Sequence, residues 1–115
     1  MKKSDVVKNN DDFNKIISKG QSVKNNDFVI YYDDNSSNIN HYGISVGKKI
    51  GNAVTRNYYK RITRNICDKN KNLYSKGKDY IIILRKACKE MNYSEIEQSF
   101  LQLINIIEKE SENEK

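Results

Sequence analysis

The first hydrophobic stripe along the chain predicts a short helix over residues 10–19. Phe13, Ile16 and Ile17 follow the three- and four-residue spacing of one helical face. Acidic residues at positions 11 and 12 favour the positive N-terminal end of such a helix, and Gly20 is a typical stop signal.

Two segments then alternate between inward and outward positions, which is typical of strands. In residues 27–33, the side chains of Phe28, Ile30 and Tyr32 would share one face. In residues 39–46, the apolar positions 42, 44 and 46 would do the same. A cluster of turn-forming residues at 33–38 separates the two segments, so we expect an antiparallel hairpin with a long loop.

Two later segments complete the hydrophobic pattern. The apolar run from Tyr80 to Leu84 is typical of a central strand that is buried on both faces. From Ser94 onward, apolar residues at 96, 100, 103 and 107 predict a long amphipathic helix, and the spacing of Ser94 and Glu97 matches a capping box. Residues 108–115 are a charged tail in which we expect this helix to fray.

With a further helix over residues 52–67, the elements run in the order α-β-β-α-β-α. This order predicts an α+β sandwich in which helices pack on a small mixed sheet. The 115 residues contain no internal repeat and fit a single domain over residues 1–115. No apolar run approaches the roughly 20 residues of a membrane helix, and no signal peptide is evident, so we expect a cytoplasmic protein.

Charge divides the chain into a basic and an acidic part. The sequence has 21 Lys and Arg against 15 Asp and Glu, a net charge of +6. Residues 1–89 carry a net charge of +11 and residues 90–115 a net charge of −5. Residues 35–67 hold six bases and no acid. Such single-sign charge favours a polyanionic partner such as nucleic acid, while a solvated basic face and an anionic membrane surface remain alternatives.

The six bases gather on one predicted helix and the turn before it. On a helical wheel, one side collects the apolar residues Val54, Tyr58, Tyr59, Ile62 and Ile66, which we expect to face the core. The other side collects Arg56, Asn57, Lys60, Arg61 and Arg64. Guanidinium groups bind phosphate oxygens in pairs, and a side-chain amide can form hydrogen bonds with the edge of a nucleobase. A merely solvated helix would normally include acids at i+4 spacing, and here there are none.

Residues for protein-based catalysis are sparse. A two-metal nuclease needs clustered carboxylates beside its groove, whereas Asp11 and Asp12 are better explained as helix-start charges. Cys67 and Cys88 lack CxxC spacing and suggest two reduced thiols, and His41 is the only histidine. We therefore expect neither a catalytic residue nor a metal site in the protein itself.

The segment from Lys48 to Arg64 resembles the signature of the bacterial ribonuclease P protein subunit, approximately Lys-Lys-x-Gly-Asn-Ala-Val-x-Arg-Asn-Arg-x-Lys-Arg-x-x-Arg. The residues that match in register are Lys48, Lys49, Gly51, Asn52, Ala53, Val54, Arg56, Asn57, Lys60, Arg61 and Arg64. Shorter matches near residues 12–13, 28–31, 43–46 and 78–83 extend the resemblance over about residues 4–107. Tyr58 departs from the pattern, since the family has the second arginine of Arg-Asn-Arg there.

The resemblance implies both a fold and a function. The family folds as α-β-β-α-β-α with a left-handed β-α-β crossover, against the usual right-handed rule. Its complex is an endonuclease that removes 5′ leaders from precursor tRNA by metal-dependent hydrolysis. Catalysis resides in the RNA subunit with Mg²⁺, so the protein alone should be inactive. The implied partners are the RNA subunit, bound one to one by a monomeric protein, and precursor tRNA.

The resemblance also implies two binding surfaces. RNA contacts fall on Lys48, Lys49, Asn52, Arg56, Asn57, Lys60, Arg61 and Arg64. The single-stranded leader would lie in a cleft between the first helix and the sheet, which we expect Phe13, Ile17, Phe28 and Tyr32 to line, with the aromatic rings stacking on nucleobases. Core positions for some of these side chains remain an alternative. The alternative functions are a generic RNA-binding or ribosome-associated protein and a protein-only nuclease.

Overall fold

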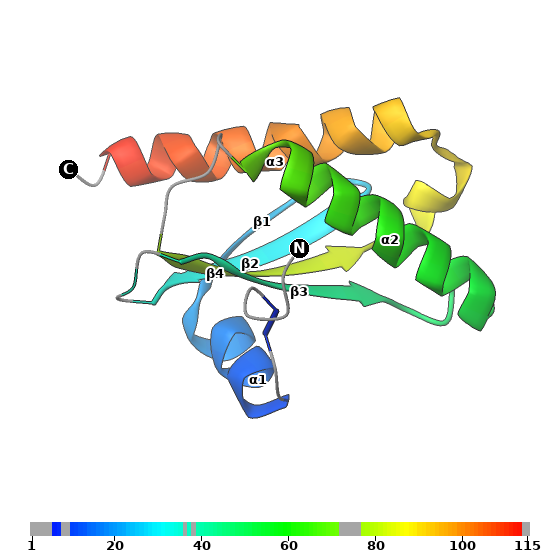
Figure 1. The fold of residues 1–115 in the computed structure, drawn as a ribbon. Coiled ribbons are helices and arrows are strands. Elements are labelled where there is room, and N and C mark those ends of the chain that lie inside the picture. Colours follow the sequence, from blue (N-terminus) through cyan, green and yellow to red (C-terminus); the bar gives the residue numbers. More distant parts are fainter. Residues whose placement is uncertain (1–5, 8–9, 36, 38, 72–76, 114–115) are drawn as a thin grey trace.

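The computed structural model describes residues 6–7, 10–35, 37, 39–71 and 77–113. Its elements are α1 (Asn10–Lys19), β1 (Gln21–Lys24), β2 (Phe28–Asp34), β3 (His41–Val46), α2 (Ala53–Lys69), β4 (Lys78–Leu84), the 3-10 helix η3 (Lys86–Glu90) and α3 (Tyr93–Asn113). Helix α1 lies on one face of the sheet, and α2 and α3 cover the other (Figure 1). The predicted α+β class, with helices on a small mixed sheet, is confirmed.

The sheet has the strand order β1-β2-β4-β3. Strand β4 lies between β2, with which it pairs antiparallel, and β3, with which it pairs parallel. The predicted hairpin of residues 27–33 with 39–46 is therefore wrong, because β4 separates the two strands. The central position suits β4, since Ile81 and Ile82 point to opposite faces and are both fully buried. The β3–α2–β4 unit is a parallel crossover, and its left-handed sense stays a prediction.

Strand β1 has no counterpart in the sequence prediction. It has four residues, of which only Val23 is buried, so no alternation is visible over its length. Its pairing with β2 is set by the turn between them. The side-chain oxygen of Asn25 accepts hydrogen bonds from the backbone N–H groups of Asp27 and Phe28, both at 2.9 Å. Turn chemistry rather than hydrophobic pattern thus creates this edge strand.

The main core lies between the sheet and the helices α2 and α3. Three rows of paired residues cross the strands β2, β4 and β3 on this face: Tyr32–Tyr80–Tyr42, Ile30–Ile82–Ile44 and Phe28–Leu84–Val46. Phe28 packs edge-on against Phe100 of α3, with ring centroids 5.8 Å apart. Burial of the four predicted core positions of α3 at 96, 100, 103 and 107 is confirmed.

A second apolar layer lies between the sheet and α1. Ile16 of α1 and Ile81 of β4 are buried there. Phe13 lies over Gly43, because a Cβ atom built at Gly43 would come within 3.2 Å of the Phe13 ring. The glycine therefore lets α1 approach β3 closely.

Helix α3 begins earlier than its sequence pattern suggested. The Asn92 side-chain oxygen accepts from the backbone N–H of Glu95 at 2.9 Å, and the Glu95 carboxylate accepts from the backbone N–H of Asn92 at 3.1 Å. The predicted capping box of Ser94 and Glu97 is wrong by two residues, since Asn caps as well as Ser and has a glutamate at the same spacing. At its other end the helix continues into the charged tail as far as Asn113.

Both cysteines are buried, and neither forms a disulfide. The Cys88 thiol donates a hydrogen bond to the carbonyl oxygen of Asp27 at 3.0 Å, and burial raises its pKa to about 11. Cys67 belongs to the buried side of α2. In the described part of the chain, no helix is both long and apolar enough to cross a membrane.

Replacing Asn92 with Ala should lower the free energy of unfolding by about 1 kcal/mol, because the Glu95 amide loses its acceptor. The matched control is Ser94→Ala, whose side chain is exposed and should change stability by less than about 0.5 kcal/mol. Urea unfolding followed by circular dichroism gives both values. Equal losses in the two variants would contradict the observed cap.

Candidate nucleic-acid interface

Helix α2 presents a different face to the core from the one its hydrophobicity indicates. Val54 is 79% exposed and Tyr58 49% exposed, so the predicted inward positions of these two residues are wrong. The buried side contains Tyr59, Thr63, Ile66 and Cys67. On the helical wheel this amounts to a rotation of roughly 80°.

Thr63 explains much of this rotation. It is fully buried, and its hydroxyl donates to the carbonyl oxygen of Tyr59 at 2.8 Å, so the polar group is satisfied within the helix. The small Cys67 lies one turn further on and is also buried. A threonine and a cysteine therefore occupy places that the apolar pattern alone would give to larger side chains.

Three polar contacts stabilise α2 and join it to η3 and α3. Its N-terminus is capped by Asn52, whose side-chain oxygen accepts from the backbone N–H of Thr55 at 3.0 Å. The Tyr59 hydroxyl donates to the carbonyl oxygen of Lys89 in η3 at 3.0 Å. Asn70, at the C-terminal end, donates to the Glu97 carboxylate of α3 at 3.0 Å. The helix is thus fixed at both ends and in its first half.

Glu97 is held as a carboxylate in this arrangement. The hydrogen bond from Asn70 is the main cause that lowers its pKa, and Lys69, 3.3 Å away, acts in the same direction. Burial opposes the shift. The contact joins the end of the basic helix to the first turn and a half of the acidic one.

The solvent side of α2 and the turn before it form a cationic surface, which we define as Lys48, Lys49, Arg56, Asn57, Lys60, Arg61 and Arg64. Lys48, Lys49, Asn57, Arg61 and Arg64 are exposed, while Arg56 and Lys60 are half-buried. Among the described residues, none of these six bases forms a salt bridge, and no acid lies between positions 35 and 67. Their charge is available to an external anion.

Asn52, the remaining predicted RNA contact, has an internal role. Its side-chain oxygen is occupied as the N-cap, although the residue is exposed. Beside it, the turn that carries Lys48 and Lys49 is closed by a hydrogen bond from the Ile50 N–H to the Gly47 carbonyl oxygen at 3.1 Å. Buried Ile50 anchors this turn to the core. The cationic surface therefore rests on a fixed backbone.

Of the four residues predicted to line the cleft, the two of β2 lie on the wrong face of the sheet, and the cleft role of the two on α1 stays a prediction. Phe28 is fully buried and Tyr32 is 5% exposed, and both face α3 rather than α1. The Tyr32 hydroxyl lies 2.9 Å from the side-chain oxygen of Gln21 and also contacts the Glu110 carboxylate of α3. Phe13 and Ile17 are half-buried on α1. The alternation of β2 defined two faces, but it could not indicate which one α1 covers.

The sheet face beside α1 carries the residues next to Phe28 and Tyr32 in the sequence. Tyr31 pairs with Ile81, and Val29 with Ile83, so their side chains lie on this face. Tyr31, Val29 and Ile83 are half-buried and remain partly accessible next to α1. We call Phe13, Ile17, Val29, Tyr31 and Ile83 the α1-side strip.

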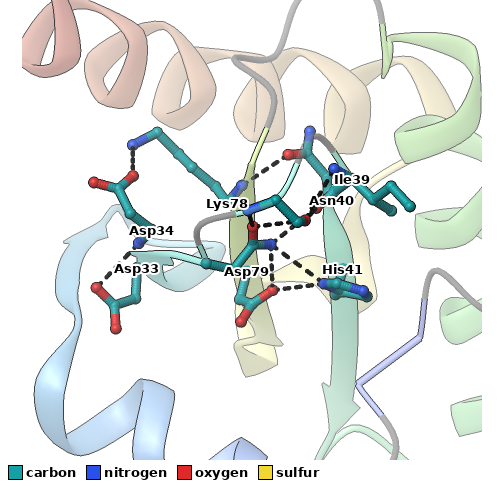
Figure 2. Close-up of polar contacts among 9 residues, drawn as sticks. Asp33, Asp34, Ile39, Asn40, His41, Lys78 and Asp79 are labelled. Atoms are coloured by element: carbon teal, nitrogen blue, oxygen red, sulfur yellow. Dashed lines mark hydrogen bonds and ion pairs between the residues drawn. The ribbon is translucent and has the colours of Figure 1, made fainter.

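A polar network closes one end of the sheet (Figure 2). His41 Nδ1 and Asp79 Oδ1 lie 2.8 Å apart, and the Asn35 amide donates to the same carboxylate oxygen at 2.8 Å. On the other face, the Lys78 ammonium donates to Asp34 at 2.8 Å. The network ties the loop after β2 to β3 and β4. Within the ranges that the structure describes, no three His, Cys, Asp or Glu side chains are arranged to hold a metal.

The fold and these surfaces define a small α+β protein with an uncompensated basic helix on one face of its sheet and an accessible aromatic strip on the other. A family model described as Ribonuclease P matches residues 1–108. The ribonuclease P protein component of Bacillus cereus strain B4264 is 44% identical over 102 residues, which cover 88% of this chain and 89% of the relative. The chain therefore belongs to the ribonuclease P protein family.

Solved structures agree with this assignment. A structure of the Staphylococcus aureus RNase P protein is 39% identical with a TM-score of 0.84, and the match covers 91% of this chain and 96% of the other. A second structure from S. aureus is of an RNase P protein mutant with defective mRNA degradation activity. It is also 39% identical, with a TM-score of 0.86 over 92% of this chain and 90% of the other.

Replacing Glu97 with Gln should lower stability at neutral pH, and the difference from the wild type should shrink as the pH falls. The carboxylate has a lowered pKa in the folded state, so its contribution is present above the ordinary value of 4.5 and is lost on acidification through the folded pKa. Urea unfolding at a series of pH values from 7 to 3 measures this difference.

The control for this experiment is Glu90→Gln, the same change at an exposed carboxylate for which the structure gives no ion pair. Its difference from the wild type should stay small at every pH. A pH-independent effect of Glu97→Gln would show that the charge of Glu97 does not join α2 to α3.

Proposed function

We propose that this chain is the protein subunit of ribonuclease P. It binds the catalytic RNA subunit and the 5′ leader of precursor tRNA, and it assists the metal-dependent endonucleolytic removal of that leader. The observation that carries the proposal is the cationic surface, whose bases match the family signature and have no ion partners among the described residues. Family membership supplies the reaction, tRNA processing by a ribonucleoprotein.

The cationic surface is suited to RNA phosphates. Exposed arginines can bind phosphate oxygens in pairs, and each lysine or arginine that contacts a phosphate releases a condensed counterion from the RNA. Arg56 and Lys60 are half-buried, so they need less ordering on binding than fully exposed side chains. Asn57 adds an exposed, uncharged amide that can pair with a base edge or a ribose.

The α1-side strip is suited to a single-stranded leader. Tyr31 lies on β2, which is paired with the buried central strand β4. The Tyr31 ring is therefore held in place while part of it stays accessible. Stacking on an aromatic ring tolerates every base, which fits leaders of differing sequence. The leader would therefore contact Val29 and Tyr31 of β2, together with Phe13 and Ile17 of α1.

The division of labour follows from the chemistry of the two subunits. Mg²⁺ would be held by the RNA subunit, where it activates water for attack on the phosphodiester. The protein contributes positive charge, which lowers repulsion between the two RNAs and hence the Mg²⁺ concentration that they need. The working unit would be one protein with one RNA in the cytoplasm.

Reconstitution with the cognate RNA subunit tests the proposal. Cleavage of precursor tRNA at limiting Mg²⁺ should require less Mg²⁺ when the protein is added. No effect of the protein, together with failure to bind the RNA subunit, would favour a generic RNA-binding or ribosome-associated protein.

A second candidate function is RNA degradation by the protein without the RNA subunit. The S. aureus RNase P protein mutant is defective in mRNA degradation activity, and this is the reason to test RNA degradation here. Reactions that omit the RNA subunit, with precursor tRNA and an mRNA transcript as substrates, separate the two functions. We expect no cleavage in these reactions.

Arg61→Ala should weaken binding to the RNA subunit and reduce the log–log salt slope of the affinity by about one unit, because one phosphate contact is lost. Lys109→Ala on α3 is the matched control, an exposed base outside the cationic surface that should leave both quantities unchanged. Filter binding between 50 and 400 mM salt measures them. Equal slopes for the two variants would remove Arg61 from the interface.

Tyr31→Ala should reduce the affinity of the reconstituted enzyme for leader-bearing precursor relative to mature tRNA by about 1–3 kcal/mol, the range for loss of a stacked base. Tyr32→Phe is the control, because Tyr32 is the neighbour on the α3 side of the sheet and should not change this ratio. Competition binding with the two tRNAs gives the ratio. An unchanged ratio in Tyr31→Ala would show that Tyr31 does not stack on the leader.

A further inference from the structure

Val54 and Tyr58 are two large apolar side chains on the solvent side of α2. They are 79% and 49% exposed and lie four positions apart in the sequence, so they are neighbours on consecutive turns. Arg61 follows three residues after Tyr58 and extends the same line. Exposed apolar side chains within a basic surface are unexpected for a helix that only contacts phosphates.

The Tyr58 ring is supported from one side. It packs edge-on against Tyr59, with ring centroids 5.3 Å apart and an interplanar angle of 76°. Tyr59 is itself fixed, because it is buried and its hydroxyl donates to the Lys89 carbonyl oxygen. A ring held by a fixed neighbour loses little conformational freedom on binding, although half of the residue is exposed.

The surroundings of Tyr58 favour RNA over protein as the occupant of this position. Arg61 is exposed one turn further along the helix, Asn57 and Arg64 are exposed on the same helix, and the sequence has no acid from position 35 to 67. Two side chains are far fewer than the 20–30 residues per partner of a stable protein interface. An aromatic ring among lysine and arginine side chains is the combination that binds unpaired nucleotides. The ring stacks on the nucleobase while the cationic side chains hold phosphates.

We propose that Tyr58, with Val54 beside it, stacks on an unpaired base of the RNA subunit. The inference rests on the proposed function and specifies one contact within it. Where the family signature has an arginine, this chain would replace a salt-dependent phosphate contact by a stacking contact that salt does not weaken. The affinity for RNA would then depend less steeply on salt than with an arginine at this position.

The test compares variants at position 58 in the full chain for binding to a transcript of the ribonuclease P RNA of the same organism. Tyr58→Ala should weaken binding about 10-fold at every salt concentration, so the slope stays unchanged. Tyr58→Phe should bind within about twofold of the wild type, because it keeps the ring. Tyr58→Arg should steepen the log–log salt slope by about one unit.

A fluorescence experiment observes the stacking directly. The chain has no tryptophan, so Tyr58→Trp introduces a single probe. Stacking on a base should quench its emission when RNA is added. Ile106→Trp is the matched control, since Ile106 is 41% exposed on α3, and its emission should not change.

Three results would overturn the inference. These are binding of Tyr58→Ala within twofold of the wild type, a reduced salt slope in that variant, and equal quenching of the two tryptophan probes. Self-association of the wild type that Tyr58→Ala abolishes would instead assign the position to contact with a second copy. Weakened binding by Arg61→Ala with normal binding by Tyr58→Ala would keep the proposed function and reject only the stacking contact.

Discussion

The burial of β4 on both faces is the constraint on which the rest of the structure depends. Its residues alternate between the two layers, and each is paired with β2 on one side and β3 on the other. Tyr80, Ile82 and Leu84 organise the layer under α2 and α3, while Ile81 and Ile83 organise the layer beside α1. One seven-residue strand therefore places the cationic surface of α2 and the α1-side strip on opposite sides of the same sheet.

The sequence was sufficient for the elements that have strong local signals. The unbroken apolar run of β4 indicated a central strand, and the 3.6-residue period of α3 identified its buried positions. It was insufficient where short-range polar contacts decide the outcome. Strand β1 depends on the side chain of Asn25, and the start of α3 depends on Asn92, which competed with an equally plausible serine.

The candidate surfaces were predictable as segments but not as faces. The spacing of the bases on α2 identified the cationic surface, yet the buried side of the helix includes Thr63, whose hydroxyl is satisfied by the backbone of its own helix. Likewise, alternation in β2 separated Tyr31 from Tyr32 without indicating which side α1 covers. Both errors have one origin, because tertiary packing decides which face is buried. The local pattern indicated the wrong face of α2 and left the two faces of β2 equivalent.

The separation of charge along the chain has a kinetic consequence. Residues 1–89 and residues 90–115 carry net charges of opposite sign, and α3 contains most of the acidic part. A molecule with this distribution has an electric dipole, and the field of a polyanion exerts a torque on it before contact. The basic end is turned toward the polyanion during diffusion, so a larger share of encounters begins in a productive orientation. The acidic C-terminal helix would thus speed association without touching the partner.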